Sequence, residues 1–471
     1  MKNAQSERYT EEQKKEIWRE LADVNARREE LIVVLDDDPT GIQTVHDINV
    51  YTDWQVQTLV DAFKEEKNMF FILTNSRGMT AKQVKKQYEE IAENIIFARR
   101  STGRCFLLIC RGDSTLRGHY PLEGETLCKA LENKDKVTFD GEIIIPFFGE
   151  GGRYTLGDIH YLKQEDKLVP VGETEFAKDK TFGYASSNLR AWCQEKTEGR
   201  YSANRIVSVG LEELQKRDYA AIENKLRRVQ GFNKVVVNAA CYEDLAVFTT
   251  ALIKVLATGK HFLYRTSASF VKVLGGILDV PLLQRKDMID EKNEHGGVVI
   301  IGSHVNKTTR QLEKLKQSDM PLCFLEFDQH KILEQDGLKK EAERVLALVE
   351  EKIKEGQTCV VYSRRERFDL PDSDKEKQLE AAVCISDAIT SIVGDLKVRP
   401  SFIVAKGGIT SSDIGTKALR VKKARVLGQA AAGVPVWQTG EESKFSGLPY
   451  VIFPGNVGDD ETLYEVVKKL I

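Results

Sequence analysis

One recurring pattern constrains the fold of this chain: a short apolar run, then a polar or glycine-rich turn, then a longer amphipathic stretch. Short apolar runs are typical of buried strands, and strands that alternate with helical stretches indicate βα units around a largely parallel sheet. The runs cover residues 31–35, 69–73, 105–110, 142–146, 205–209, 234–237, 261–264, 297–301, 322–326, 358–362, 401–405 and 450–453. The sequence therefore predicts an α/β fold in which mainly parallel sheets are flanked by helices.

The length and one polar segment indicate how the chain divides. At about 100–200 residues per domain, 471 residues suggest two or three domains. The polar segment 285–295, followed by two glycines, separates the two series of apolar runs. We expect a helical extension at residues 1–30, a first domain at 31–290 and a second at 296–471. The charge runs of the extension predict a solvated helix.

Composition excludes several classes of protein. The 69 Lys and Arg against 72 Asp and Glu give a net charge of −3, which argues against a general nucleic-acid binder. No apolar run approaches the ~18 residues of a membrane span, and the first 30 residues lack the apolar core of a signal peptide. The eight cysteines form no C-x-x-C pair and the seven histidines show no metal-ligand spacing. We expect a cytoplasmic protein with neither a membrane partner nor a structural zinc site.

The turn after the run at 31–35 carries three consecutive carboxylates, Asp36, Asp37 and Asp38. One Asp would suffice as a helix cap or turn residue, which is the ordinary interpretation. Three crowded carboxylates raise one another's pKa or need a cation or a hydroxyl-rich ligand to share them. We therefore favour a binding site at this turn.

Two further turns place arginines and hydroxyls at the same predicted sheet edge, where open α/β sheets bind ligands. Arg77 follows the run at 69–73, and Asp113, Ser114 and Arg117 follow the run at 105–110. Each turn alone could be a capped loop, but three on adjacent βα units favour a joint site. Arginine suits a carboxylate or phosphate, and Asp accepts hydrogen bonds from hydroxyls. The pattern predicts a small anionic ligand with several hydroxyls, and an Asp beside a hydroxyl can act as a general base.

Three turns of the second half are rich in small residues and run into helices. Glycines allow close backbone approach, and the N–H groups at helix N-termini bind anions. The turns contain Gly302-Ser303, Gly407-Gly408-Ile409-Thr410, and Gly455-Asn456-Val457-Gly458. One such turn would be an ordinary connection between a strand and a helix. Three of them in one domain, opposite an acidic and arginine-rich site, favour a nucleotide triphosphate that faces an acceptor.

Two nucleotide motifs can be set aside. The stretch from Gly302 to Thr309 lacks the glycine before the lysine that a P-loop requires, and its spacing is one residue short. No G-x-G-x-x-G follows any predicted strand. The chain is therefore predicted to be neither a P-loop NTPase nor a dinucleotide-binding protein of that type.

Nine stretches, in this order, resemble the four-carbon acid sugar kinases. They are DDDPTGIQT, TNSRGMT, RGDSTLRGHYPLE, PFFGEGGRYTLGDIHY, ETEFAKD, LYRTSASFV, GSHVNKTTRQLEKL, AKGGITSSDI and FPGNVGDDETL. The resemblance implies an N-terminal domain that holds the acid sugar, a C-terminal domain that holds ATP, and an active site in the cleft between them. It implies substrate residues Asp36, Asp37, Arg77, Asp113, Ser114 and Arg117. It implies nucleotide residues Ser303, Gly407, Gly408, Ile409, Thr410, Gly455, Asn456 and Gly458.

Two positions depart from the family pattern. Val305 stands where a second small residue of G-S-x-S is usual, and Phe453 stands where a lysine precedes P-G. A lysine there could neutralise phosphate charge, so that Lys406 or Mg²⁺ must compensate, or the nucleotide sits differently. These departures indicate a divergent subgroup.

The resemblance implies an ATP- and Mg²⁺-dependent kinase that phosphorylates the terminal hydroxyl of threonate, erythronate or a 3-oxo-tetronate. Asp37 and Asp113 are the candidate bases, and Arg77 and Arg117 are expected to hold the carboxylate of the sugar. Two alternatives remain, an ATP-dependent ligase that activates the acid and a non-catalytic sensor of acid sugars. A homodimer is the default expectation for the assembly.

Overall fold

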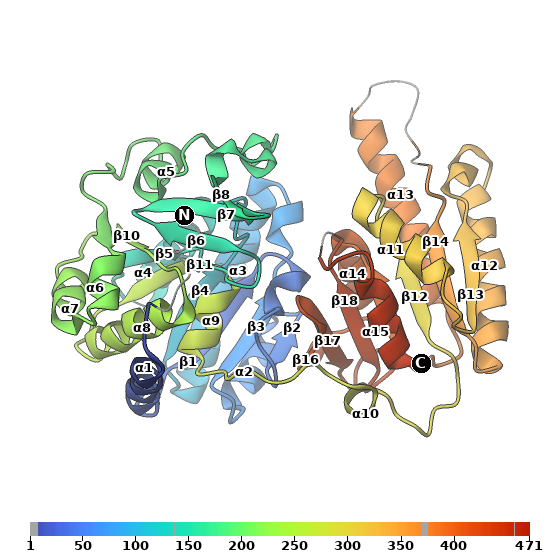
Figure 1. Cartoon of the computed structure of the whole chain (residues 1–471), viewed down its shortest axis with the longest axis horizontal. Helices are drawn as coiled ribbons and strands as arrows, with labels where there is room; N and C mark the ends of the chain where they lie inside the picture. The colour runs from blue at the N-terminus through green and yellow to red at the C-terminus, as the bar shows by residue number, and fades with distance from the viewer. Residues whose placement is uncertain (1–7, 136, 367, 369–374, 456) are drawn as a thin grey trace. The chain divides into compact units, whose positions relative to one another are not determined.

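The computed structural model describes residues 8–471 except 136, 367, 369–374 and 456, and its contacts divide the chain into two units (Figure 1). The first unit extends to Gly41 and resumes over Asp53–Asp279, and the second comprises Ile42–Thr52 and Val280–Ile471. The short segment 42–52 therefore leaves the first unit directly after the acidic turn. Sequence reasoning assigned this segment and residues 280–290 to the first domain.

The first unit is built on a parallel sheet of seven strands in the order β3-β1-β4-β11-β5-β10-β9. Every residue of β1 and β3 is buried, because helices cover the strands on both faces. The strands are β1 (Leu31–Asp36), β3 (Met69–Leu73), β4 (Phe106–Arg111), β5 (Gly141–Ile145), β9 (Val207–Val209), β10 (Asn233–Val237) and β11 (Phe262–Thr266). The longer helices are α2 (Val56–Lys64), α3 (Ala81–Thr102), α4 (Leu122–Asp135), α7 (Tyr219–Arg227) and α8 (Tyr242–Leu256). A small antiparallel sheet joins β6 (Arg153–Leu156), β7 (Ile159–Gln164) and β8 (Lys167–Pro170).

The N-terminal helix α1 (Glu11–Asn25) packs against α8. Thr10 begins it with a capping box, and Ile17 and Leu21 are buried on one face. Arg217 reaches back to form ion pairs with Glu16 and Glu20 at 2.6 and 2.7 Å. The expected helix is therefore present, but the prediction that it is solvated is wrong for the face that carries Ile17 and Leu21.

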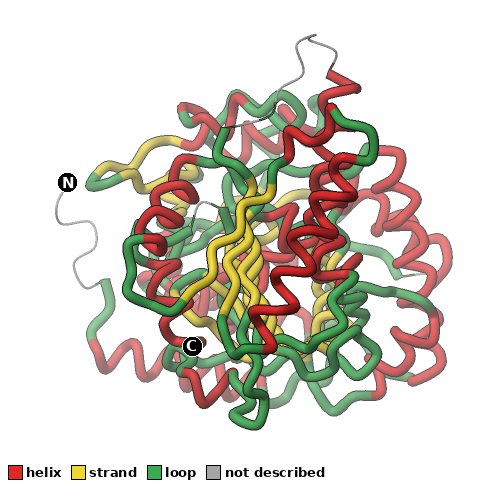
Figure 2. Tube along the Cα trace, turned by 90° about the vertical axis from the view of Figure 1, so that its right-hand side faces the viewer, coloured by secondary structure: helices red, strands yellow, loops and turns green. Residues whose placement is uncertain are grey.

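The second unit contains a mixed sheet in the order β13-β14-β12-β15-β18-β17-β16-β2, whose first five strands are parallel. Figure 2 shows strands in yellow between helices in red. The strands are β2 (Asn49–Tyr51), β12 (Val298–Ile301), β13 (Leu322–Phe327), β14 (Thr358–Ser363), β15 (Ile403–Lys406), β16 (Lys423–Ala431), β17 (Val434–Thr439) and β18 (Pro449–Phe453). The longer helices are α11 (Asn306–Lys316), α12 (Gly337–Lys354), α13 (Lys375–Gly394) and α15 (Thr462–Leu470). Strand β2 pairs antiparallel with β16, which is why segment 42–52 belongs to this unit.

Each of the twelve predicted apolar runs coincides with a strand, and the prediction of two mainly parallel α/β domains is confirmed. The strands that the pattern missed are β2, β6, β7, β8, β16 and β17. Within the described residues, no helix is both long and apolar enough to cross a membrane.

Candidate substrate and nucleotide sites

The acidic turn lies at the carboxyl end of β1, beside the end of β4. The parallel register pairs Asp36 with Arg111, the last residue of β4, and Arg111 Nη1 lies 3.2 Å from Asp36 Oδ1. The same nitrogen lies 3.7 Å from Asp37 Oδ1. Asp36 and Asp37 are both almost fully buried. The sheet therefore brings two carboxylates and a guanidinium together at one buried edge.

Asp36 is held in an environment that opposes its ionisation. Its Oδ2 has no hydrogen-bond partner among the described residues, and its carboxyl group lies directly against Gly41. A Cβ at Gly41 would lie 1.9 Å from that oxygen, so only glycine fits there. Burial raises the pKa of Asp36 to about 7, with Arg111 opposing the shift and the neighbouring Asp37 and Asp38 adding to it. This carboxyl group therefore exchanges its proton near neutral pH.

Arg77 binds the other two carboxylates of the turn. It lies in the short helical turn Ser76–Gly78 that follows β3. Its Nε and Nη2 contact the two oxygens of Asp37 at 3.1 and 2.6 Å, and its Nη1 contacts Asp38 Oδ2 at 3.0 Å. Such a two-point pair fixes the plane of the carboxylate. The predicted residues Asp37 and Arg77 are thus direct partners.

The turn after β4 contributes Asp113 and Arg117, which form a second pair. Arg117 Nε lies 2.8 Å from Asp113 Oδ2, and its guanidinium lies 4.9 Å from the ring centre of Phe176. Burial alone would raise the pKa of Asp113, but Arg77 and Arg117 together lower it well below its usual range. Asp113 therefore remains ionised. Phe176 lies in the short helical turn Glu175–Lys178.

Ser114 is buried in the turn after β4, and His160 contacts the backbone of this turn. The Nε2 of His160 lies 2.8 Å from the Ser114 carbonyl, and its Nδ1 lies 2.9 Å from the Thr155 hydroxyl. Burial lowers the pKa of His160 to about 4, so the ring is neutral at physiological pH. Because a carbonyl can only accept, Nε2 carries the proton and Nδ1 accepts from Thr155. This neutral histidine fixes the backbone beside Asp113.

Arg265 lies beneath these turns and was not singled out by the sequence. It belongs to β11, contacts Glu123 Oε2 at 3.2 Å and donates to the Arg117 carbonyl at 2.8 Å. A Cβ at Gly112 would lie 1.9 Å from its guanidinium, and one at Gly118 would lie 2.9 Å from it. The two glycines of the R-G-D-S-T-L-R-G stretch are therefore required by the close approach of a buried arginine.

In the second unit, the three glycine turns follow β12, β15 and β18 and lie against one another. A Cβ at Gly302 would lie 2.4 Å from Thr410 Oγ1, and one at Gly455 would lie 3.3 Å from Ser303 Oγ. A Cβ at Gly407 would lie 3.2 Å from that of Ser303. The structure thus brings Ser303, Gly407, Thr410 and Gly455 together.

The remaining predicted nucleotide residues lie around this cluster. Gly408 and Ile409 begin α14 (Gly408–Asp413), and the Ile409 side chain is exposed. The Gly458 carbonyl accepts a hydrogen bond from Lys307 Nζ at 2.9 Å. Gly458 has φ 78°, a left-handed conformation that favours glycine. Asn456 lies outside the described residues.

Lys406 lies on the face of Phe453, the residue that departs from the family pattern. Its ammonium lies 3.8 Å from the ring centre and donates to the Pro454 carbonyl at 2.9 Å. Burial, with a contribution from nearby Lys307, lowers the pKa of Lys406 to about 7. Phe453, which replaces the lysine of the family pattern, therefore packs against another lysine, Lys406, whose charge depends on its surroundings.

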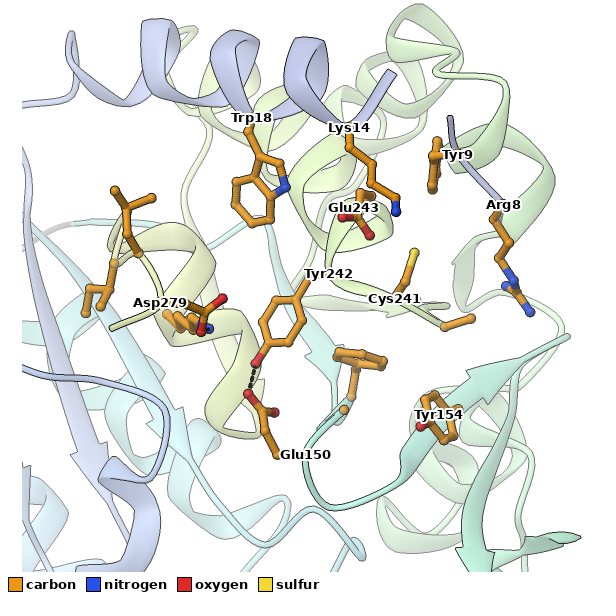
Figure 3. Close-up of a pocket in the computed structure, with 16 residues that line it drawn as sticks. Arg8, Tyr9, Lys14, Trp18, Glu150, Tyr154, Cys241, Tyr242, Glu243 and Asp279 are labelled. Atoms are coloured by element: carbon orange, nitrogen blue, oxygen red, sulfur yellow. Dashed lines mark hydrogen bonds and ion pairs between the residues drawn. The ribbon is translucent and has the colours of Figure 1, made fainter. Parts of the chain in front are cut away.

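A cavity of about 840 Å³ lies in the first unit (Figure 3). Trp18 and Lys14 of α1 face Tyr242 of α8 across it, and Tyr242 donates to Glu150 at 2.5 Å. Among the described residues, its lining includes none of those predicted to bind substrate. Part of the lining comes from α1.

Two family models match the chain, a sugar-binding N-terminal domain over residues 32–274 and a nucleotide-binding C-terminal domain over residues 298–463. The chain is therefore an α/β protein that joins a sugar-binding to a nucleotide-binding domain. It belongs to the DUF1537 family, the four-carbon acid sugar kinases. No curated protein shows significant similarity to it.

Solved structures show the same fold. A proposed tRNA synthase from Salmonella typhimurium LT2 is 17% identical, with a TM-score of 0.67, covering 92% of this chain and 98% of its own. A Haemophilus influenzae protein of the DUF1537 family is 17% identical, with a TM-score of 0.63, covering 93% of this chain and 100% of its own. At this level of identity, the likeness concerns the fold alone.

Proposed function

We propose that the protein is an ATP-dependent kinase that phosphorylates the terminal hydroxyl of a four-carbon acid sugar of the threonate, erythronate or 3-oxo-tetronate class. The observation that carries the proposal is the cluster at the ends of β1, β3 and β4, where Arg77, Arg111 and Arg117 hold three aspartates. A sugar-binding and a nucleotide-binding domain in one chain support transfer between their ligands.

In the sugar site, Arg77 and Arg117 are proposed to share their charge between the aspartates and the carboxylate of the substrate. Asp37 and Asp113 are proposed to accept hydrogen bonds from its hydroxyls, and one of them to take the proton of the terminal hydroxyl. The low pKa of Asp113 makes this carboxylate a weak base. Asp36 is a third candidate, because a general base works best with a pKa near the operating pH.

In the nucleotide site, the proposed contacts are the backbone of the turns at Ser303, Gly407–Thr410, Gly455 and Gly458, with the ammonium of Lys406. At Gly408 a Cβ would meet no atom within 4 Å, so the backbone of this turn leaves room for the close approach of a phosphate. ATP supplies the phosphoryl group that is transferred. Mg²⁺ is proposed to enter with the triphosphate. Among the described residues no group of His, Cys, Asp and Glu is arranged to hold a metal ion by itself.

The direct test incubates the protein with ATP, Mg²⁺ and a panel of D- and L-threonate, D-erythronate and their oxo analogues. A phosphate ester with stoichiometric ADP supports the kinase. An acyl conjugate would instead support an acid-activating ligase, and binding without ATP turnover across the panel would support a sensor.

Single substitutions can test whether Asp37 and Asp113 serve the sugar site and not the nucleotide site. Asp37→Asn and Asp113→Asn should reduce turnover strongly while ATP affinity stays within about twofold of the wild type. The exposed Asp166, in the turn between β7 and β8, offers a matched control, and Asp166→Asn should change neither quantity. Equal losses of turnover and ATP affinity would contradict the assignment of these aspartates to the sugar site.

A further inference from the structure

Arg365 lies beside the glycine turns without having been predicted by the sequence. It follows β14, which pairs in parallel with β12, so the turns after the two strands are neighbours. Its Nη2 donates to the Ser303 carbonyl and to the Thr309 hydroxyl, each at 2.8 Å. The arginine is therefore anchored on the turn that carries Ser303.

The guanidinium of Arg365 is incompletely satisfied. Its Nη1 is buried and has no hydrogen-bond partner among the described residues, and no carboxylate in that part of the chain forms an ion pair with it. Burial lowers the pKa of Arg365, against the attraction of the more distant Glu313 on α11. A partly buried cation held only by a carbonyl and a hydroxyl is unfavourable unless an anion completes its surroundings.

The N-terminus of α11 lies at the same place. This helix of 11 residues begins after Val305, and no described side chain caps it. The Thr308 hydroxyl lies 3.3 Å from Ser303 Oγ, so its first turn packs on the same serine. The positive end of a helix dipole attracts negative charge. The arginine and the helix start therefore favour the same kind of ligand from two independent elements.

We propose that Arg365 and the N-terminus of α11 together bind the terminal phosphates of the nucleotide. The inference rests on the proposed function for the identity of the ligand, but on geometry for the anion site itself. The planar fork of arginine matches two oxygens of one phosphate. Because Ser303 joins this site to the glycine turns, the phosphate chain extends from those turns toward Arg365.

The neighbouring Arg364 provides a matched control. Its Nη2 lies 2.9 Å from Glu366 and its Nη1 lies 3.9 Å from Asp328. Acidic residues already satisfy this guanidinium, so it has no need of an added anion. A substitution at Arg364 removes the same charge one residue away and leaves the proposed site intact.

The first experiment measures the affinities of ATP, ADP and AMP by calorimetry. Loss of a charge-assisted phosphate contact should weaken ATP binding by about 10- to 150-fold in Arg365→Met, and AMP binding by less than about twofold. Arg364→Met should match the wild type. Arg365→Gln keeps a donor for the Ser303 carbonyl and serves as the second variant if the methionine variant does not fold. Equal weakening of ATP and AMP, or none, would overturn the proposal.

A second experiment separates this inference from the proposed function. Inorganic tripolyphosphate should raise the thermal midpoint of the wild type and of Arg364→Met, and should fail to do so for Arg365→Gln. If the wild type binds no nucleotide but shows this pattern, the anion site stands and the kinase proposal fails. If tripolyphosphate stabilises Arg365→Gln as much as the wild type, or stabilises neither, the anion site is refuted.

Discussion

Replacing Asp36 by Asn should stabilise the fold while it impairs the proposed activity. The substitution keeps the shape of the side chain and removes only its ability to ionise. Asp36 is buried, and its negative charge is opposed by desolvation and by Asp37 and Asp38, with Arg111 as its only ion-pair partner among the described residues. An amide at this position avoids that penalty.

The magnitude follows from the shift in pKa. In the folded protein the pKa of Asp36 is about 7 against an ordinary value of 3.8, a difference of about 3 units. At ~1.4 kcal/mol per unit, ionisation of Asp36 lowers the free energy of unfolding by up to about 4 kcal/mol. Because the folded pKa is raised, this loss is absent below pH 4, grows between pH 4 and 7, and is constant above pH 7. The advantage of Asp36→Asn should follow the same curve.

The assay is urea unfolding at pH 5, 6, 7 and 8, followed by tryptophan fluorescence in a Trp437→Phe background. The other three tryptophans, Trp18, Trp54 and Trp192, all lie in the first unit, so the signal reports that unit. Asp166→Asn, at an exposed carboxylate, should show no difference that depends on pH. A variant that is less stable than the wild type at pH 8, or whose advantage does not change with pH, would refute the reasoning.

Two further predictions concern the supports of the two sites. Gly112→Ala should destabilise the first unit by about 1–3 kcal/mol, because the new Cβ would lie 1.9 Å from the buried Arg265 guanidinium. The control Gly210→Ala, with no atom within 4 Å of its Cβ, should change stability by less than about 0.5 kcal/mol. Similar unfolding midpoints for the two variants would contradict this prediction. Nucleotide binding at pH 8 should be accompanied by uptake of up to about one proton, because the pKa of Lys406 is lowered to about 7 and phosphate favours its charged form. Calorimetry in buffers of different ionisation enthalpy should show this uptake in the wild type and in the control Lys468→Met. It should show little uptake at pH 6 and none in Lys406→Met.

The sequence alone determined the parallel strands, because each contains a short apolar run and most of them are buried on both faces. It could not identify the antiparallel strands as readily. β2 has only three residues, and β16 and β17 are interrupted by Gly428 and Pro435 near shifts in register. No local pattern in the sequence indicates that segment 42–52 belongs to the second unit, since its position depends on hydrogen bonds to a strand about 375 residues away.

The sequence also determined where the candidate site residues gather, because the carboxyl ends of parallel strands share one edge and their turns carry the polar side chains. Only the tertiary structure decided which of them are partners and in which state of ionisation. Asp36, Asp37 and Asp113 are the same residue type, yet one is paired with Arg111, one is clamped by Arg77 and one is held ionised by two arginines. Burial and the distance to the nearest opposite charge set those differences, and neither quantity can be read from residues that lie far apart along the chain.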